Sequence, residues 1–226
     1  MNCIYFVIPC YNEQEVLPIT AEQLRIKYDQ LLQSGLIAES SRILLVDDGS
    51  KELKSLISEA VISDDSRIMF VNDGSRDSTW DIITGLSEEE KYFTGISLSR
   101  NRGHQNALLA GLMTARSFCD AAISLDADLQ DDINAMDAML QKFQDGCDIV
   151  YGVRSDRETD TVFKRCTAQG YYKFMSGMGG ELVYNHADYR LMSRRALDGL
   201  AEFGEVNLFL RGIVPMIGYR SDIVTY

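Results

Sequence analysis

The sequence predicts an α/β fold in which helices flank a mainly parallel central sheet. Short apolar runs alternate with longer amphipathic segments through the first two-thirds of the chain, a pattern typical of repeated strand–helix–strand units. The short runs are apolar throughout, as expected when helices cover both faces of a sheet. Ligands bind such sheets at the carboxyl ends of the strands, so we expect the functional residues there.

The predicted elements follow from residue periodicity and from apolar runs bounded by turn residues. Strands are predicted at residues 4–8, 43–46, 68–71, 95–98, 121–125 and 149–153. Helices are predicted at residues 13–36, 80–86, 106–118, 133–143 and 193–203. The segment 171–182 favours neither helix nor strand, and the sequence ends within a strand-like run at residues 223–226.

The composition narrows the classes of protein to which this sequence can belong. A length of 226 residues suits a single domain over residues 1–226. The 22 Lys and Arg residues are outnumbered by 34 Asp and Glu residues, and the net charge of −12 excludes a general nucleic-acid binder. The sequence has no apolar stretch long enough to span a bilayer and no signal peptide, so we expect this chain alone to be soluble. Five cysteines without a C-x-x-C motif indicate reduced thiols.

A ten-residue segment occurs twice in the sequence. Residues 41–50 and 66–75 lie 25 positions apart and are identical at seven of ten positions. We therefore expect a duplicated or inserted strand–helix segment at about residues 43–67. Both copies end in Asp-Gly-Ser, with Asp48 in the first and Asp73 in the second. An acid at the carboxyl end of a strand can bind ribose hydroxyls. The first copy also resembles the acidic opening of a receiver domain, but the other residues of that site are missing.

The strongest chemical signal is a strand that ends in two carboxylates. Asp126 and Asp128 follow the apolar run 121–125. Side chains two residues apart in an extended segment point to the same side, so these two carboxylates can converge on one hard cation. Mg²⁺ or Mn²⁺ held by carboxylates and phosphate oxygens would bind a nucleotide diphosphate. The alternative is an acidic loop that caps the next helix, whereas the Gly and Glu of an EF-hand are absent.

Two further turns follow predicted strands. After the first strand, Tyr11 offers a stacking face for a nucleobase and Asn12 can cap the next helix. A plain strand-to-helix turn is the alternative there. After the strand at 95–98, Arg100 and Arg102 precede a helix and could face a diphosphate, while His104 is either a general base or a structural residue. Arginines in the last third indicate either an anionic ligand or a solvated surface with salt bridges.

Taken in order, these segments resemble the inverting family 2 glycosyltransferases, specifically those that transfer sugars to dolichol or undecaprenyl phosphate. The resemblance covers nearly the whole chain. The matching segments are residues 7–13, 71–79, 98–105, 126–131, 150–154, 187–193 and 210–212. The resemblance implies a GT-A type nucleotide-diphospho-sugar transferase fold. It also implies metal-dependent, inverting transfer of a hexose from a nucleotide sugar to a polyprenyl phosphate.

The resemblance also implies the site residues. The nucleotide would be bound by Pro9, Tyr11, Asn12, Glu13, Gln105, Asp126 and one of the two repeat acids, Asp73 or Asp48. The metal, Mg²⁺ or Mn²⁺, would be held by Asp126 and Asp128. The acceptor phosphate would meet Arg154, Arg190 and Arg211, and the catalytic residues would be Asp128, Asp188 and Arg190. Asp73 is favoured over Asp48 because only Asp73 is followed by Arg76-Asp77-Ser78-Thr79 and a predicted helix.

Three departures and two alternatives accompany the resemblance. The family has one copy of the repeated motif, and it often has Gly where this chain has Ala187. Its members usually continue into membrane helices, so we expect a C-terminal membrane region beyond this chain and a location at the cytoplasmic face of the membrane. A homo-oligomer is left open. The alternatives are transfer to a saccharide hydroxyl, with Asp188 as the base, and a nucleotide-sugar-binding module with impaired activity.

Overall fold

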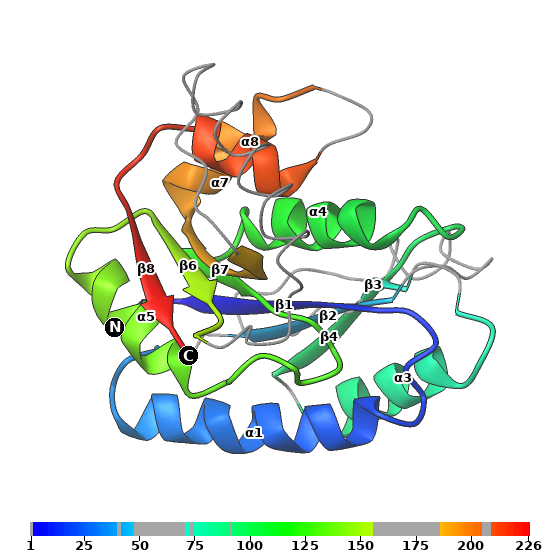
Figure 1. The fold of residues 1–226 in the computed structure, drawn as a ribbon. Helices are drawn as coiled ribbons and strands as arrows, with labels where there is room; N and C mark the ends of the chain where they lie inside the picture. Colours follow the sequence, from blue (N-terminus) through cyan, green and yellow to red (C-terminus); the bar gives the residue numbers. More distant parts are fainter. Residues whose placement is uncertain are drawn as a thin grey trace.

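The described residues form an eight-stranded sheet with helices on both of its faces (Figure 1). The computed structural model describes residues 2–39, 42–47, 71–72, 75–90, 92–155, 186–204 and 209–226. The strands are β1 (Ile4–Cys10), β2 (Arg42–Asp47), β3 (Val71–Asn72), β4 (Phe93–Ser97), β5 (Ala121–Ser124), β6 (Ile149–Val153), β7 (His186–Ser193) and β8 (Ser221–Thr225). The helices are α1 (Leu17–Gln33), α3 (Thr79–Glu89), α4 (His104–Ala115), α5 (Ala135–Gln144), α7 (Arg194–Ala201) and α8 (Leu210–Met216).

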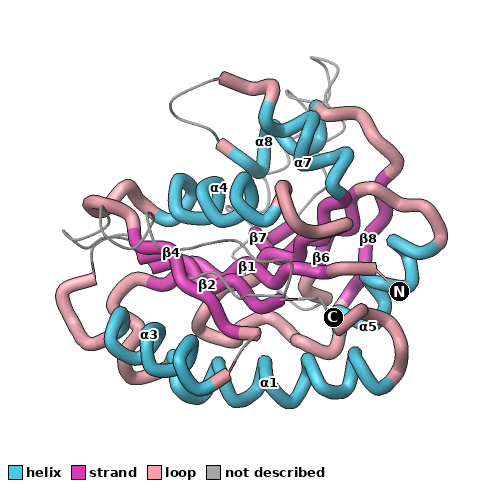
Figure 2. Tube along the Cα trace, turned by 180° about the vertical axis from the view of Figure 1, so that it is seen from behind, coloured by secondary structure: helices cyan, strands magenta, loops and turns pink. Residues whose placement is uncertain are grey.

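The alternation of side chains along β1 divides the core into two layers. Every residue of β1 is buried. Ile4, Phe6 and Ile8 pack into the cluster that also contains the buried face of α1, whereas Tyr5 and Val7 pack into the cluster beneath α4 and α7. Figure 2 shows from behind the helices that cover these two layers, with α1, α3 and α5 on one side of the sheet and α4, α7 and α8 on the other. This burial explains why the predicted strands are apolar on both faces.

Strand direction decides which residues meet at the functional edge. The strands run in the order β2-β4-β3-β1-β5-β7-β6-β8, and β2 also pairs with β1. The pairings of β1 with β2, β3 and β5 are parallel, as is that of β6 with β8, whereas β7 is antiparallel to both β5 and β6. Because β7 runs the opposite way, its first residues lie at the edge where the parallel strands end. The prediction of a mainly parallel sheet is confirmed.

The predicted elements agree with the described ones, with a few corrections. The first strand continues through Pro9 to Cys10, and the first helix begins at Leu17 rather than at residue 13. The prediction that Asn12 caps this helix is wrong, because its N-cap is Val16. The strand β7 and the helix α8 were not predicted. Most of the run 68–71 and all of 171–182 lie outside the described residues. No helix within the described ranges is long and apolar enough to cross a membrane.

The two copies of the repeat meet the same partners in the sheet. In β2, Asp47 pairs with Cys10 of β1 and with Ser97 of β4. In β3, Asn72 occupies the equivalent repeat position and pairs with the same two residues. A strand inside a sheet has one neighbour on each side. Because both copies pair with the same residues of β1 and β4, we expect that either copy alone can fill the position between these two strands.

We predict that one copy of the repeat is sufficient for folding. Deleting residues 42–66 removes the first strand copy, and deleting residues 48–72 joins that strand directly to the second Asp-Gly-Ser. Each variant should unfold cooperatively in urea, with a free energy of unfolding within about 1 kcal/mol of the parent, since loop length contributes weakly to stability. Deleting residues 42–72 removes both strands and serves as the control, which should not fold because β1 and β4 lose their shared partner. Failure of both single-copy variants to fold would contradict this expectation.

Candidate functional site

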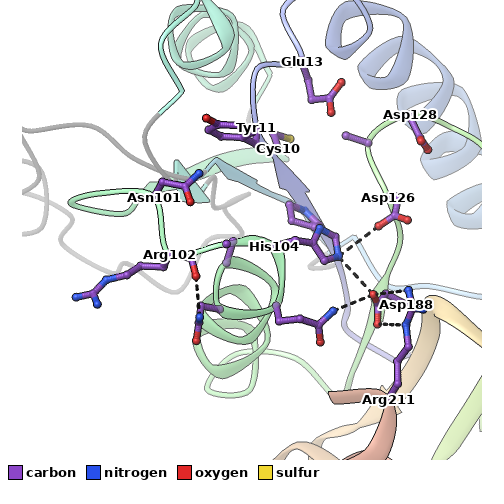
Figure 3. A pocket seen from close by; sticks show the side chains of 16 residues that line it. Cys10, Tyr11, Glu13, Asn101, Arg102, His104, Asp126, Asp128, Asp188 and Arg211 are labelled. Carbon is purple, nitrogen blue, oxygen red and sulfur yellow. Dashed lines mark hydrogen bonds and ion pairs between the residues drawn. The ribbon is translucent and has the colours of Figure 1, made fainter. Parts of the chain in front are cut away.

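A cavity of about 670 Å³ opens at the carboxyl edge of the sheet. Its lining comes from the turn after β1, the loop before α4, the loop after β5, the start of β7 and helix α8. In Figure 3, Glu13 and Tyr11 lie at one end of the cavity and Arg211 at the other, with His104 and Asp126 between them. The cavity thus lies at the edge where the parallel strands end, as the fold class predicts.

The turn after β1 is fixed by the tail of the second repeat copy. The backbone N–H of Asn12 donates to Ser75 Oγ at 3.1 Å, and that of Glu13 donates to Thr79 Oγ1 at 2.9 Å. In return, Asn12 Oδ1 accepts from the backbone N–H of Arg76 at 3.0 Å. Asn12 has a φ of 55°, a backbone conformation that Asn tolerates better than most residues. These bonds hold Tyr11, which is 46% exposed, at the cavity wall.

Asp126 and Asp128 both line the cavity, but they follow the end of β5, and Ala127 and Asp128 form a turn instead of continuing the strand. Thr20 of α1 holds this turn by donating from Oγ1 to the carbonyl of Ala127 at 2.6 Å. Asp128 is exposed, and its Oδ1 accepts from the backbone N–H of Gln130 at 3.1 Å. Leu129 follows with a φ of 53°, a strained conformation for a branched residue that the surrounding contacts must maintain.

The side of the cavity that carries Asp126 and Asp128 fits a divalent cation. The Oδ1 atom of Asp126 is buried and has no hydrogen-bond donor among the described residues. Burial and the nearby carboxylates, Asp131, Asp188 and Asp128, raise the pKa of Asp126, against the opposing effect of His104. Burial followed by the charges of Asp128, Asp77 and Asp126 also raises the pKa of Glu13. These shifts indicate excess negative charge, which a cation would relieve.

The protein side chains alone do not enclose such a cation. Among the described residues, no group of three or more His, Cys, Asp or Glu side chains is arranged to hold a metal ion. A pair of carboxylates leaves most coordination positions open to water and to phosphate oxygens, which is how Mg²⁺ is commonly held beside nucleotides. The donor set therefore suits a metal that binds together with a diphosphate.

Across the cavity from Glu13 and Tyr11, the carboxylate of Asp188 contacts four neighbouring side chains. Its Oδ1 contacts Arg190 Nη2 at 2.5 Å, and its Oδ2 contacts Arg211 Nη2 at 3.0 Å. Gln105 Nε2 donates to the same Oδ2 at 3.0 Å, and His104 Nε2 lies 3.5 Å away. Burial opposes ionisation, but the hydrogen bond from His104 and the charges of Arg190 and Arg211 hold the pKa of Asp188 well below its usual range. Asp188 is therefore an ionised, fully partnered carboxylate.

Arg190 lies behind Asp188 and does not line the cavity. It is 1% exposed, and its Nη1 also donates to the carbonyl of Leu210 at 3.4 Å. Burial lowers the pKa of Arg190, partly offset by the charge of Asp188. Its guanidinium contacts Asp188 and the carbonyl of Leu210 instead of the cavity. The roles expected for Arg190 in acceptor binding and catalysis stay predictions, and these contacts favour a role in holding Asp188.

His104 connects the two sides of the cavity. It is the first residue of α4, and its Nε2 lies 3.6 Å from Asp126 Oδ1 and 3.5 Å from Asp188 Oδ2. The hydrogen bond to Asp188 raises the pKa of His104, with burial opposing and the charges of Asp126 and Asp188 adding to the rise. The preceding Gly103 has a φ of 83°, a conformation that favours glycine and lets the loop turn into the helix.

The remaining expected site residues divide into three groups. Those that line the cavity are Pro9, Tyr11, Glu13, Gln105, Asp126, Asp128, Asp188 and Arg211. Asn12 and Arg154 are outside the lining, and Arg154 contacts Asp131, with 2.7 Å between Nη2 and Oδ1. Asp48 and Asp73 lie outside the described residues. Sequence reasoning missed the anchoring by Ser75 and Thr79, although the polar run before α3 marked a helix start.

Comparison with known proteins identifies relatives across nearly the whole chain. Residues 51–200 match the family model described as glycosyl transferase family 2. The uncharacterized glycosyltransferase YkoT of Bacillus subtilis strain 168 is 48% identical over 97% of this chain. The prophage bactoprenol glucosyl transferase homolog of Escherichia coli K12 is 35% identical over 99% of this chain. This chain spans 58% and 62% of the lengths of these two relatives.

A solved structure confirms the expected fold. Glucosyl-3-phosphoglycerate synthase from Mycobacterium tuberculosis, in complex with Mn²⁺, uridine diphosphate and phosphoglyceric acid, superposes with a TM-score of 0.54. The match covers 98% of this chain and 68% of that chain, at 13% sequence identity. At this identity the likeness concerns the fold alone. It agrees with the GT-A architecture that the sequence predicts.

We predict that Asp188→Asn destabilises the protein because it leaves Arg190 buried without a counter-charge. The free energy of unfolding, measured by urea denaturation, should fall by about 3–5 kcal/mol, the range for breaking one partner of a buried ion pair. The double variant Asp188→Asn/Arg190→Met removes both charges and should recover a large part of this loss. A loss below about 1 kcal/mol in the single variant, as for an exposed ion pair, would contradict the buried pairing of Asp188 with Arg190.

Proposed function

The chain belongs to glycosyltransferase family 2, and on that premise we propose that it transfers a hexose from a nucleotide-diphospho-sugar to a polyprenyl phosphate with inversion. One observation carries the choice of acceptor. The carboxylate at the centre of the cavity, Asp188, is paired with Arg190, Arg211 and His104, and its pKa is well below the usual range. So weak a base is poorly suited to remove a proton from a hydroxyl group. A phosphate acceptor is already anionic and needs no such base.

The donor occupies the end of the cavity formed by β1 and the acid loop. Tyr11 is half exposed on the cavity wall and offers its ring to the nucleobase. Glu13 lies beside it and can accept hydrogen bonds from donor hydroxyls. We assign the diphosphate to the neighbouring acids Asp126 and Asp128, which line the same cavity. The names of the relatives and the bound uridine diphosphate of the structural neighbour make UDP-glucose the first donor to test.

A divalent metal, Mg²⁺ or Mn²⁺, would be held by Asp126 and Asp128. When bound with the diphosphate, such an ion neutralises charge that develops on the departing nucleotide. The buried Oδ1 of Asp126 has no hydrogen-bond donor among the described residues, with His104 Nε2 3.6 Å away, and this supports the assignment. Thr20 and Gln130 keep the carrying turn in place through the carbonyl of Ala127 and the carboxylate of Asp128.

The acceptor phosphate is assigned to Arg211. Its side chain is 44% exposed and lines the cavity while contacting Asp188. A guanidinium binds phosphate oxygens in pairs and stays charged at any accessible pH. Asp188 orients this guanidinium, and Gln105 fixes Asp188 and accepts from the backbone N–H of Leu210 at 3.3 Å. An attack from this end, opposite the diphosphate, inverts the anomeric carbon. Because polyprenyl phosphates reside in membranes, the cavity must work at a membrane surface.

The second repeat copy, with Asp73, is proposed to be the nucleotide-binding one. Its continuation at Ser75 and Thr79 anchors the turn at Asn12 and Glu13. The family match begins at residue 51, after the first copy and before the second. Both observations favour Asp73 over Asp48 as the acid beside the ribose.

The direct test is transfer by the purified protein in detergent. We expect UDP-glucose, undecaprenyl phosphate and Mn²⁺ to yield a glucosylated lipid, with GDP-mannose and UDP-N-acetylglucosamine as competing donors. Asp128→Ala should abolish metal-dependent binding of UDP by calorimetry, whereas Asp132→Ala changes an exposed acid of the same loop and should leave binding intact. Transfer to a saccharide hydroxyl, with none to the lipid phosphate, would contradict the proposed acceptor.

We predict that Arg211→Lys affects the acceptor and not the nucleotide. Lysine keeps the charge but loses the planar fork, so kcat/KM for polyprenyl phosphate should fall at least about tenfold, near 1.4 kcal/mol. The affinity for the nucleotide sugar should stay within about twofold, well under 1 kcal/mol. Arg116→Lys is the control, because Arg116 pairs with Asp198 away from the cavity lining. An unchanged acceptor dependence would remove Arg211 from the acceptor site.

A further inference from the structure

The loop after the metal-binding acids is held from its far side by residues that follow two strands. Asp131 is 4% exposed, which is rare for an aspartate unless it is paired. Its Oδ1 accepts from Arg154 Nη2 at 2.7 Å and from Nε at 3.2 Å, and from the hydroxyl of Tyr226 at 2.6 Å. Arg154 follows β6 and Tyr226 follows β8. One buried carboxylate therefore joins the acid loop to two strands beyond β7.

The strand ends that supply these donors are themselves fixed. The backbone N–H of Tyr226 donates to the carbonyl of Val153 at 3.0 Å, and that of Ser155 donates to the carbonyl of Tyr226 at 2.7 Å. The Tyr226 ring meets the edge of the Tyr189 ring, with centroids 5.4 Å apart. Tyr189 is fully buried, and its hydroxyl donates to the carbonyl of Asp132 at 3.1 Å. The donors are thus pre-positioned and not free side chains.

These contacts act on the segment that the metal would need. Asp131 lies three residues after Asp128 and five after Asp126. Between them, Leu129 has the strained φ of 53°, and strain of this kind persists only where neighbouring contacts hold the backbone. Arg154 Nη2 also pairs with Asp131 Oδ1 at 2.7 Å, so a positive charge faces the acid loop from its far side. The contacts therefore bear on both the geometry of the metal-binding acids and the charge around them.

We propose that Arg154 and Tyr226 are positioning residues that act through Asp131 to fix the metal-binding acids Asp126 and Asp128. This inference rests on the proposed function, because it takes these two acids as the metal ligands. Partners of metal ligands that touch no substrate commonly change metal affinity by about tenfold to a hundredfold. The arrangement also explains why Arg154 lies outside the cavity lining.

The test compares metal affinity, loop protection and stability in matched variants. Tyr226→Phe removes a single hydroxyl, and Arg154→Met removes the guanidinium while keeping a similar length. The control is Asp222→Asn, which breaks the 2.5 Å contact of β8 with Lys142 but touches no residue of the acid loop. The measurements are Mn²⁺ affinity by electron paramagnetic resonance with UDP present, amide hydrogen exchange at residues 125–133, and urea denaturation.

We expect both positioning variants to weaken Mn²⁺ binding by about tenfold, the lower end of the range for such partners. Amide exchange at residues 125–133 should accelerate in both variants without metal. Asp222→Asn should keep parental Mn²⁺ affinity and loop protection, whatever its effect on the free energy of unfolding.

Two outcomes would overturn the inference. The first is parental Mn²⁺ affinity in both positioning variants; the second is an equal loss of affinity in the Asp222→Asn control. If the parent itself binds no Mn²⁺, the metal assignment in the proposed function fails. In that case amide exchange alone decides the inference, and unchanged protection of residues 125–133 in Tyr226→Phe overturns it.

Discussion

The buried ion pair between Asp188 and Arg190 is the constraint on which the site depends. Two charges taken out of water are tolerated only when each is closely partnered. Arg190 is almost wholly enclosed, so Asp188 must stay ionised beside it. That fixed carboxylate then orders His104, Gln105 and Arg211 around the cavity. The Asp188–Arg190 pair therefore fixes the positions of the cavity side chains that contact Asp188.

The antiparallel strand β7 makes this arrangement possible. In the register of the sheet, Arg190 lies opposite Ser124 of β5 and Tyr151 of β6. Asp188 is two residues earlier and on the same side of the strand. It therefore projects at the edge where the loop after β5 carries Asp126 and Asp128. A parallel strand in this place would present its last residues at that edge instead. The antiparallel direction of β7 thus brings Asp188 close to Asp126 and Asp128, the proposed metal ligands (Figure 3).

Much of the fold could be predicted from the sequence, because buried strands such as β1 and β6 are unbroken apolar runs. The strand β7 was missed because it carries Asp188 and Arg190 among its apolar residues, which interrupts that pattern. The helix α8 is short and contains Gly212 and Pro215, so its sequence gives little helical signal. In both cases tertiary contacts, and not local propensity, stabilise the element.

The candidate site could be predicted in part. Strand-end position alone indicated Asp126 and Asp128, and the cavity contains both. The burial of Arg190 behind Asp188 could not be predicted from the sequence, because arginine is usually exposed. The partners of Arg154 and Tyr226 were equally hidden, since their contacts to Asp131 join positions 23 and 95 residues apart. Contacts between residues so far apart in the sequence form only when the sheet has assembled.

The most direct test of the central claim is a crystal structure of the protein soaked with MnCl₂ and UDP, with anomalous diffraction to locate manganese. The account predicts an anomalous peak coordinated by Asp126 and Asp128 and by diphosphate oxygens, with the base beside Tyr11 and Asp188 still bound to Arg190 and Arg211. UDP bound in the cavity with no manganese at these two acids would contradict the account, as would UDP bound at the Arg211 end.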